Sequence, residues 1–287
     1  MIGDRTYSQT AKPVLRLDQM PRFIAPLVTL IFVLTASADE RSAHGFRKVK
    51  SFSVPEAHQA VAVDKESFYA ISNRTIARYD KETGESKPKA VARWTAPADS
   101  PVQHLNSGIV LNGRLYCANS NWPKKPLKNT VEIFEAQTLQ HLERKEFPET
   151  EGAINWIERH RGAWWIVFAF YGEADVRKTR LVRYNDEWQS TGVWTFPESV
   201  IQRFLPNSNS GGAFGPKGRL FATGHDHAEV YVLAVGEKPG VLIHEATVKA
   251  PIAGQGIAWD RGEPNNLYGI VRRTREVVKM QFASVDQ

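Results

Sequence analysis

Two imidazoles flank a carboxylate in His225-Asp226-His227, the densest group of reactive side chains in the sequence. Alternate residues of a β-strand point to the same side, so His225 and His227 would face one way. Two imidazole nitrogens and a third histidine from elsewhere form a typical zinc site. The alternative is that these side chains cap the end of a strand and hydrogen-bond to a neighbouring strand. The pattern therefore predicts either a metal site or a polar strand end.

Proton transfer is the second chemistry that the sequence offers. Glu151 is a carboxylate at a predicted strand start, and His104 and His225 are imidazoles expected at the same channel mouth. Burial of Glu151 would raise the pKa of its carboxyl group toward the range used by general acids and bases. The alternative is a solvated loop acid, because Glu149 lies two residues away and charged runs are usually exposed. We treat Glu151, His104 and His225 as candidate catalytic residues.

Carboxamides and one arginine form a candidate ligand-binding set. Arg272 carries the forked donors that suit a ligand carboxylate. The oxygen donors of Asn106, Asn209, Asp226 and Glu151 resemble the carboxylate and amide sets that hold calcium. The candidate cofactor is therefore a divalent ion, either calcium at these oxygens or zinc at the histidines. The candidate ligand-binding residues are His58, Gln59, Asn106, Asn155, Asn209, Asp226, Gln255 and Arg272.

A repeated unit must position these residues. Pairs containing an aromatic residue recur every 47 to 56 residues, a period typical of β-propeller blades. Each pair follows an apolar run and a polar turn, as expected for a hairpin. The pairs are Phe68-Tyr69, Leu115-Tyr116, Trp164-Trp165, Leu220-Phe221 and Leu267-Tyr268.

The fold class predicted from this repeat is all-β: a β-propeller of five four-stranded blades. The fifth copy ends at its third strand, and residues 46–54 alternate apolar and polar side chains, so this N-terminal strand is expected to close the last blade. Residues 198–205, between Pro197 and Pro206, are expected to form one short helix. An irregular β-sandwich is the alternative. In a propeller the first strand of each blade lines the central channel, so the candidate polar residues would meet at one mouth.

The hairpin segments at residues 104–110, 223–231 and 254–260 resemble those of exported bacterial β-propellers that are sometimes labelled cycloisomerase-like. The repeat is also similar to five-bladed glutamine cyclotransferase-like propellers and, loosely, to gluconolactonase-like propellers. The resemblance covers residues 46–282 and implies the fold. No residue pattern carries a catalytic residue over from these families.

The N-terminal segment predicts export. An uncharged apolar run of about twelve residues follows Arg22 and precedes Ala36-Ser37-Ala38, which resembles a signal-peptidase site. Residues 1–38 are therefore expected to be a signal peptide, with Met20 as an alternative start, and residues 39–287 to form one propeller domain. The predicted location is periplasmic or secreted, with no stable membrane span after cleavage. A buried strand or an uncleaved anchor is the alternative.

Composition excludes several classes. A single cysteine, Cys117, rules out an intrachain disulfide framework. The net charge of +6 is small and scattered, so no nucleic acid partner is expected. The sequence contains no serine-hydrolase elbow, phosphate-binding glycine loop or zinc-protease helix motif.

These patterns predict that an exported propeller binds a small polar ligand, a glycan or a peptide at its channel mouth. One alternative is an enzyme of lactonase, cycloisomerase or cyclotransferase type, with Glu151 or a histidine transferring a proton. The other is a scaffold that binds proteins through its rim loops.

Overall fold

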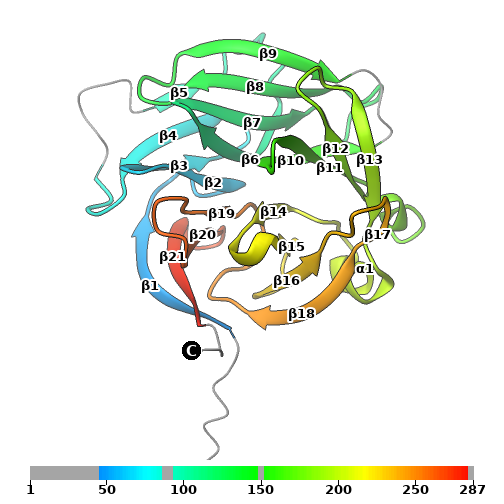
Figure 1. Ribbon diagram of the computed structural model, residues 1–287. Helices are drawn as coiled ribbons and strands as arrows, with labels where there is room; N and C mark the ends of the chain where they lie inside the picture. The colour runs from blue at the N-terminus through cyan, green and yellow to red at the C-terminus, as the bar shows by residue number, and fades with distance from the viewer. Residues whose placement is uncertain (1–44, 86–92, 148–151, 284–287) are drawn as a thin grey trace, which may run out of the picture. The chain divides into compact units, whose positions relative to one another are not determined.

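The computed structural model describes residues 45–85, 93–147 and 152–283. The predicted signal peptide, its cleavage site and Glu151 lie outside the described residues. The described chain is mostly β-strand, and its sheets are arranged around a common centre (Figure 1). Among the described residues, no helix is long and apolar enough to cross a membrane.

Antiparallel strands form successive groups along the chain. The first three groups are β2 (Ala60–Val63), β3 (Ser67–Ile71), β4 (Thr75–Asp80) and β5 (Arg93–Thr95); β6 (His104–Leu111), β7 (Arg114–Ser120), β8 (Asn129–Glu135) and β9 (His141–Phe147); and β10 (Ala153–His160), β11 (Ala163–Ala169), β12 (Arg180–Tyr184) and β13 (Ser190–Thr195). Eight further strands form one continuous sheet, because β1 (Gly45–Ser53) and β18 (Ile243–Lys249) pair in parallel at Gly45 and Lys249. We divide this sheet at that contact into two groups of four: β14 (Gly211–Phe214), β15 (Leu220–Thr223), β16 (Glu229–Ala234) and β18; and β19 (Ala258–Trp259), β20 (Asn266–Val271), β21 (Glu276–Ala283) and β1. A single two-residue strand, β17 (Gly240–Val241), pairs in parallel with β13.

The predicted aromatic pairs lie on the second strand of each group, and their side chains are buried except for that of Tyr116, which is half-buried. Phe68 and Tyr69 are both fully buried on β3. The predicted N-terminal strand pairs antiparallel with β21, in the register Phe46 to Phe282. The predicted helix is present as α1 (Glu198–Phe204), and Cys117 is buried as a free thiol. The arrangement is all-β and propeller-like.

The core lies between the sheets, in clusters that each join two consecutive groups of strands. Trp156 and Leu220, for example, share the cluster between the third and fourth groups. Phe52, Phe68 and Val277 belong to the cluster that joins the fifth group to the first. Packing therefore continues around the described strands from the last group back to the first.

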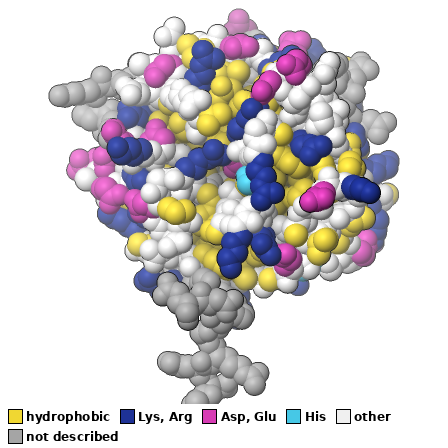
Figure 2. All heavy atoms as spheres, in the orientation of Figure 1, with side chains coloured by type: hydrophobic (Ala, Val, Ile, Leu, Met, Phe, Trp, Pro, Cys, Tyr) yellow, Lys and Arg dark blue, Asp and Glu magenta, His cyan; other side chains and the backbone are white. Residues whose placement is uncertain are grey.

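The two ends of the central axis differ in the loops and side chains that lie there. The face turned to the reader in Figures 1 and 2 has the β14–β15 connection at its centre. It also holds the short turns β6–β7 and β10–β11, and we call it the turn face. The opposite end, where β6 begins and β20 ends, carries the histidines and carboxamides singled out in the sequence. We call that end the polar mouth.

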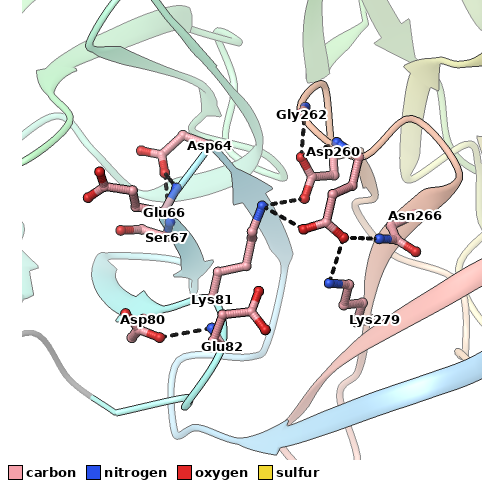
Figure 3. A network of polar contacts seen from close by, with 11 residues as sticks. Asp64, Glu66, Ser67, Asp80, Lys81, Glu82, Asp260, Gly262, Asn266 and Lys279 are labelled. Carbon is pink, nitrogen blue, oxygen red and sulfur yellow. Dashed lines mark hydrogen bonds and ion pairs between the residues drawn. The ribbon is translucent and has the colours of Figure 1, made fainter.

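A buried ion pair joins the first and fifth groups near the turn face (Figure 3). The Lys81 ammonium lies 2.8 Å from the Asp260 carboxylate and 3.2 Å from that of Glu263. Asp260 also accepts hydrogen bonds from the backbone N–H groups of Gly262 and Glu263. Glu263 in turn pairs with Lys279 at 2.9 Å. This network links the β19–β20 connection to the segment after β4.

Candidate functional site

One buried carboxamide stands at the start of the inner strand of each group. All five belong to the predicted ligand-binding set, and each is less than a tenth exposed. They are Gln59, Asn106, Asn155, Asn209 and Gln255. The structure therefore gathers at one end of the axis side chains that are separated by up to 196 positions in the sequence.

Local irregularities of the backbone aim several of these side chains. The ladder between β6 and β7 shifts register between Leu105 and Gly108, which places Asn106 in a β-bulge. The ladder between β10 and β11 shifts between Ile154 and Trp156, which does the same for Asn155. Bulges re-aim side chains and often adjoin functional sites. Gln255 precedes β19 with a φ of 71°, an uncommon conformation for a residue with a side chain.

Three of the carboxamides connect neighbouring strand groups. The Asn106 amide donates to the Ile154 carbonyl over 3.1 Å, and the Asn155 amide donates to the Asn209 carbonyl over 2.5 Å. Asn209 donates to two further carbonyls, and its Oδ1 accepts the Trp156 indole N–H over 2.7 Å. Asn209 is fully buried with these groups engaged, so it holds the ring together and is not exposed to a ligand.

Arg272 is the charged centre of the polar mouth, and neutral acceptors hold it. Its Nε donates to the His58 carbonyl over 2.8 Å. Its Nη2 donates to Gln59 Oε1 over 2.9 Å and to Gln255 Oε1 over 2.8 Å. Among the described residues, no carboxylate lies within ion-pair distance of this guanidinium. Burial lowers the pKa of Arg272, and the Asp226 charge opposes that shift.

Imidazoles surround this guanidinium. Burial, and then the charges of Arg272, Arg275 and His104, lower the pKa of His58 to about 4. Burial and the Arg272 charge also lower the pKa of His104. Both imidazoles are therefore neutral at pH 7. His225 lies with Nε2 3.4 Å from an Arg272 nitrogen.

His225 and Asp226 form a directly bonded pair. His225 Nδ1 lies 2.7 Å from Asp226 Oδ1, and Asn207 donates to the other Asp226 oxygen over 2.9 Å. This pair orients the imidazole so that its Nε2 faces the mouth. An imidazole oriented by a carboxylate has the arrangement used for general-base chemistry.

Aromatic side chains extend the mouth on one side. The Tyr171 hydroxyl accepts a hydrogen bond from the Asn155 amide over 3.1 Å, and the Tyr171 ring lies 4.4 Å from that of Trp122. Both rings line a cavity of about 430 Å³, which also contacts Lys125 and Lys178. Burial raises the pKa of the Tyr171 hydroxyl, so it is protonated at neutral pH.

The metal hypothesis gains no support from the side chains that the structure describes. Within residues 45–85, 93–147 and 152–283, no group of three or more His, Cys, Asp or Glu side chains could hold a metal ion. His225 contacts Asp226 and Arg272 through its two nitrogens, and His227 is exposed. The calcium alternative included Glu151, which lies outside the described residues.

Sequence reasoning missed one residue that shapes the mouth. Thr223, at the end of β15, is fully buried, and its hydroxyl donates to the Gln255 carbonyl over 2.6 Å. This bond fixes the backbone that carries Gln255. The sequence contains no signal for this role, because a threonine at a strand end is explained by its β-propensity alone.

Comparisons with known proteins are informative about fold only. No protein-family model matches the chain, and no curated protein matches it either. Among solved structures, the PQQ-bound aldose sugar dehydrogenase from Streptomyces coelicolor is 12% identical, with a TM-score of 0.50, over 85% of this chain and 84% of that one. A luciferin-regenerating enzyme is 10% identical, with a TM-score of 0.47, over 83% and 96%. The Kuenenia stuttgartiensis hydrazine synthase is 12% identical, with a TM-score of 0.44, over 77% and 69%. The likeness to the sugar dehydrogenase supports a propeller-like fold.

Proposed function

We propose that the chain is an exported five-bladed β-propeller that binds a small carboxylate-bearing polar ligand, such as an acidic sugar or a peptide, at its polar mouth. The five groups of antiparallel strands and the packing between consecutive groups support the blade count. The export part rests on the apolar run and the Ala36-Ser37-Ala38 site in the sequence.

Arg272 is the observation that carries the ligand class. Its guanidinium is partly buried, and its described partners are a carbonyl, two carboxamide oxygens and an imidazole nitrogen. Desolvating a charged group is costly unless an opposite charge compensates for it. A ligand carboxylate would supply that charge and match the planar fork of the guanidinium.

The cavity lined by Tyr171 and Trp122, beside the mouth, suggests that the ligand also has a ring or chain. Tyr171 connects the mouth to this cavity, because its hydroxyl bonds to Asn155 and its ring lines the cavity. The Tyr171 hydroxyl and Arg272 also interact electrostatically. A carboxylate at Arg272 would thus leave the rest of the ligand lying along Tyr171 and Trp122.

Arg272→Gln should weaken the binding of D-glucuronate about 10- to 100-fold, as expected when hydrogen bonds to a charged group are lost. Isothermal titration calorimetry with the purified mature chain measures this change. Methyl glucoside has the same ring without the carboxylate and should bind far more weakly to the unaltered protein. Arg273→Gln is the matched control, because the exposed Arg273 makes no hydrogen bond or ion pair among the described residues.

Two results would contradict the proposal. One is the absence of any preference for glucuronate over the neutral glucoside. The other is an equal loss of affinity in the Arg272 and Arg273 variants, which would indicate diffuse electrostatic attraction. Urea unfolding of both variants separates loss of binding from loss of the fold.

Anion binding at the mouth should strengthen as the pH falls from 7 toward 4.5. The pKa of His58 is about 4 without ligand, and a bound anion would raise it. Ligand binding is then coupled to proton uptake, so lower pH favours the bound state. Glucose 6-sulfate is the appropriate probe, because its own charge stays constant in this range. A pH-independent affinity, or the same pH dependence in His58→Asn, would contradict this assignment.

The His225–Asp226 pair favours one second function, proton transfer in a lactonase, cycloisomerase or cyclotransferase reaction. Asp226 holds Nδ1 of the imidazole at 2.7 Å and leaves Nε2 beside Arg272, which would stabilise a developing negative charge. Turnover of a glucuronolactone that is lost in His225→Asn and retained in His227→Asn would favour this enzyme function over simple binding.

A further inference from the structure

Two adjoining cavities lie on the turn face, at the opposite end of the axis from the polar mouth. One has a volume of about 360 Å³ and the other about 340 Å³, and both are lined by His160, Arg161 and Phe214. The larger cavity extends toward Trp165, and the other extends toward Trp259. Figure 2 shows Lys and Arg side chains near the centre of this face, with a histidine between them.

Two of the arginines that line the second cavity already have carboxylate partners. Arg159 Nη1 lies 2.7 Å from the Asp186 carboxylate. Arg261 Nη2 lies 2.5 Å from the carboxylate of Glu158. Burial raises the pKa of Glu158, and the Arg261 charge opposes that shift. These two arginines are accounted for by the protein's own charges.

Two other guanidinium groups have no such partner. Arg161 makes no ion pair with a carboxylate of the described residues, although it lines both cavities. Arg183 donates to the Thr191 hydroxyl over 2.9 Å and lies over the Trp165 ring at 5.9 Å. The only carboxylate lining the larger cavity is that of Glu237. The larger cavity therefore holds more positive than negative charge.

Aromatic rings form the walls of both cavities. The His160 ring stacks on Phe214 with centroids 4.1 Å apart and an interplanar angle of 5°. Trp259 is 6% exposed, and its indole N–H has no hydrogen-bond partner among the described residues. A Cβ atom at Gly215 would lie 2.3 Å from that nitrogen, so the Gly215 backbone packs directly against the indole edge. The Trp259 ring contributes to the wall of the smaller cavity.

The turn that carries Arg161 departs from the residue preference of its backbone. Arg161 and Gly162 have φ values of 49° and 72°, and Asn112 and Gly113 have nearly the same values, 49° and 74°, in the β6–β7 turn. Asn-Gly is the preferred pair for this turn type, because asparagine tolerates positive φ. An arginine at the first position is locally unfavourable, and such departures concentrate at functional positions.

We propose that these turn-face cavities form a second ligand site, which takes a small oxyanion carried on a planar ring, such as an aromatic sulfonate, phosphate or carboxylate. Arg161 and Arg183 bind the oxyanion, and the His160–Phe214 stack contacts the ring. The site uses none of the residues of the polar mouth.

Titration calorimetry with p-toluenesulfonate tests this site. Arg161→Asn removes the guanidinium and creates the Asn-Gly pair already present at Asn112-Gly113, so the turn is retained. We expect this variant to bind p-toluenesulfonate about 10- to 100-fold more weakly, as for loss of a charged hydrogen-bonded contact. Methanesulfonate, which lacks the ring, and benzyl alcohol, which lacks the charge, should each bind far more weakly to the unaltered protein.

Two control variants locate the effect. Lys217→Asn removes a positive charge from the same face at another left-handed position, φ 56°, and Lys217 lines neither cavity. This variant should bind p-toluenesulfonate like the unaltered protein. An equal loss of p-toluenesulfonate affinity in Lys217→Asn would indicate general electrostatic attraction in place of a defined site. A loss of affinity in Arg272→Gln that matches the loss in Arg161→Asn would place the binding at the polar mouth. Absence of binding, or methanesulfonate binding as tightly, would also overturn the proposal.

Discussion

Lys81→Met should lower the free energy of unfolding by about 3–5 kcal/mol, the range for removing one partner of a buried ion pair. The Lys81 side chain is 6% exposed and that of Asp260 is 0% exposed, so the substitution leaves a buried carboxylate without its counter-ion (Figure 3). The pair joins the segment after β4 to the β19–β20 connection. We therefore expect the contact between the first and last strand groups to weaken most. Urea unfolding of the purified protein measures the loss.

Two further variants test the cause of this loss. Lys65→Met changes an exposed lysine near the same face and should alter stability by no more than about 0.5 kcal/mol. The double variant Lys81→Met, Asp260→Leu removes both charges and should be more stable than Lys81→Met alone. A double variant that is no more stable would show that packing, and not the unpaired carboxylate, accounts for the loss.

Gly256→Ala should destabilise the protein by about 1–3 kcal/mol through overpacking, and it should also weaken binding at the polar mouth. A Cβ atom at this position would lie 2.3 Å from the Ala60 Cβ and 3.0 Å from the Ala60 Cα on the neighbouring inner strand. Backbone cannot move aside as a flexible side chain can. The strand would shift, and with it Gln255, which holds Arg272.

Gly240→Ala is the matched control for this substitution. A Cβ atom at Gly240 would meet no atom within 4 Å, and Gly240 is not among the positive-φ glycines. Replacing such a glycine is expected to be neutral or to stabilise by up to about 1 kcal/mol. Thermal unfolding together with glucuronate titration measures both effects. Unchanged stability and affinity in Gly256→Ala would contradict the close packing of the inner strands at Ala60.

The fold was largely predictable because its signals are local. Apolar runs, Asn-Gly and Asp-Lys turns, and aromatic pairs such as Phe68-Tyr69 indicate each hairpin from a few neighbouring residues. Pro197 and Pro206 delimit the helix in the same way. The pairing of β1 with β21 was predicted from one missing strand, although 238 positions separate Gly45 from its partner Ala283.

The sequence allowed the location of the candidate site to be predicted, but it did not indicate the role of each residue there. Strand starts converge in any propeller, so Gln59, Asn106 and Gln255 were expected at one mouth. Their partners depend on which strand each one faces and on how deeply it is buried. Asn209 and Gln59 are similar polar residues in the sequence, but Asn209 is fully engaged in the ring whereas Gln59 holds Arg272.

Local sequence patterns were enough to predict the order of strands, their turns, the short helix and the gathering of polar residues at one end of the axis. These features follow from side-chain periodicity and turn chemistry, which act over a few residues. The folded arrangement was needed to establish that neutral oxygens hold Arg272, that His225 is bonded to Asp226, and that Arg161 lines two further cavities. Charge balance and burial depend on groups that are distant in the chain, so local sequence patterns do not predict them.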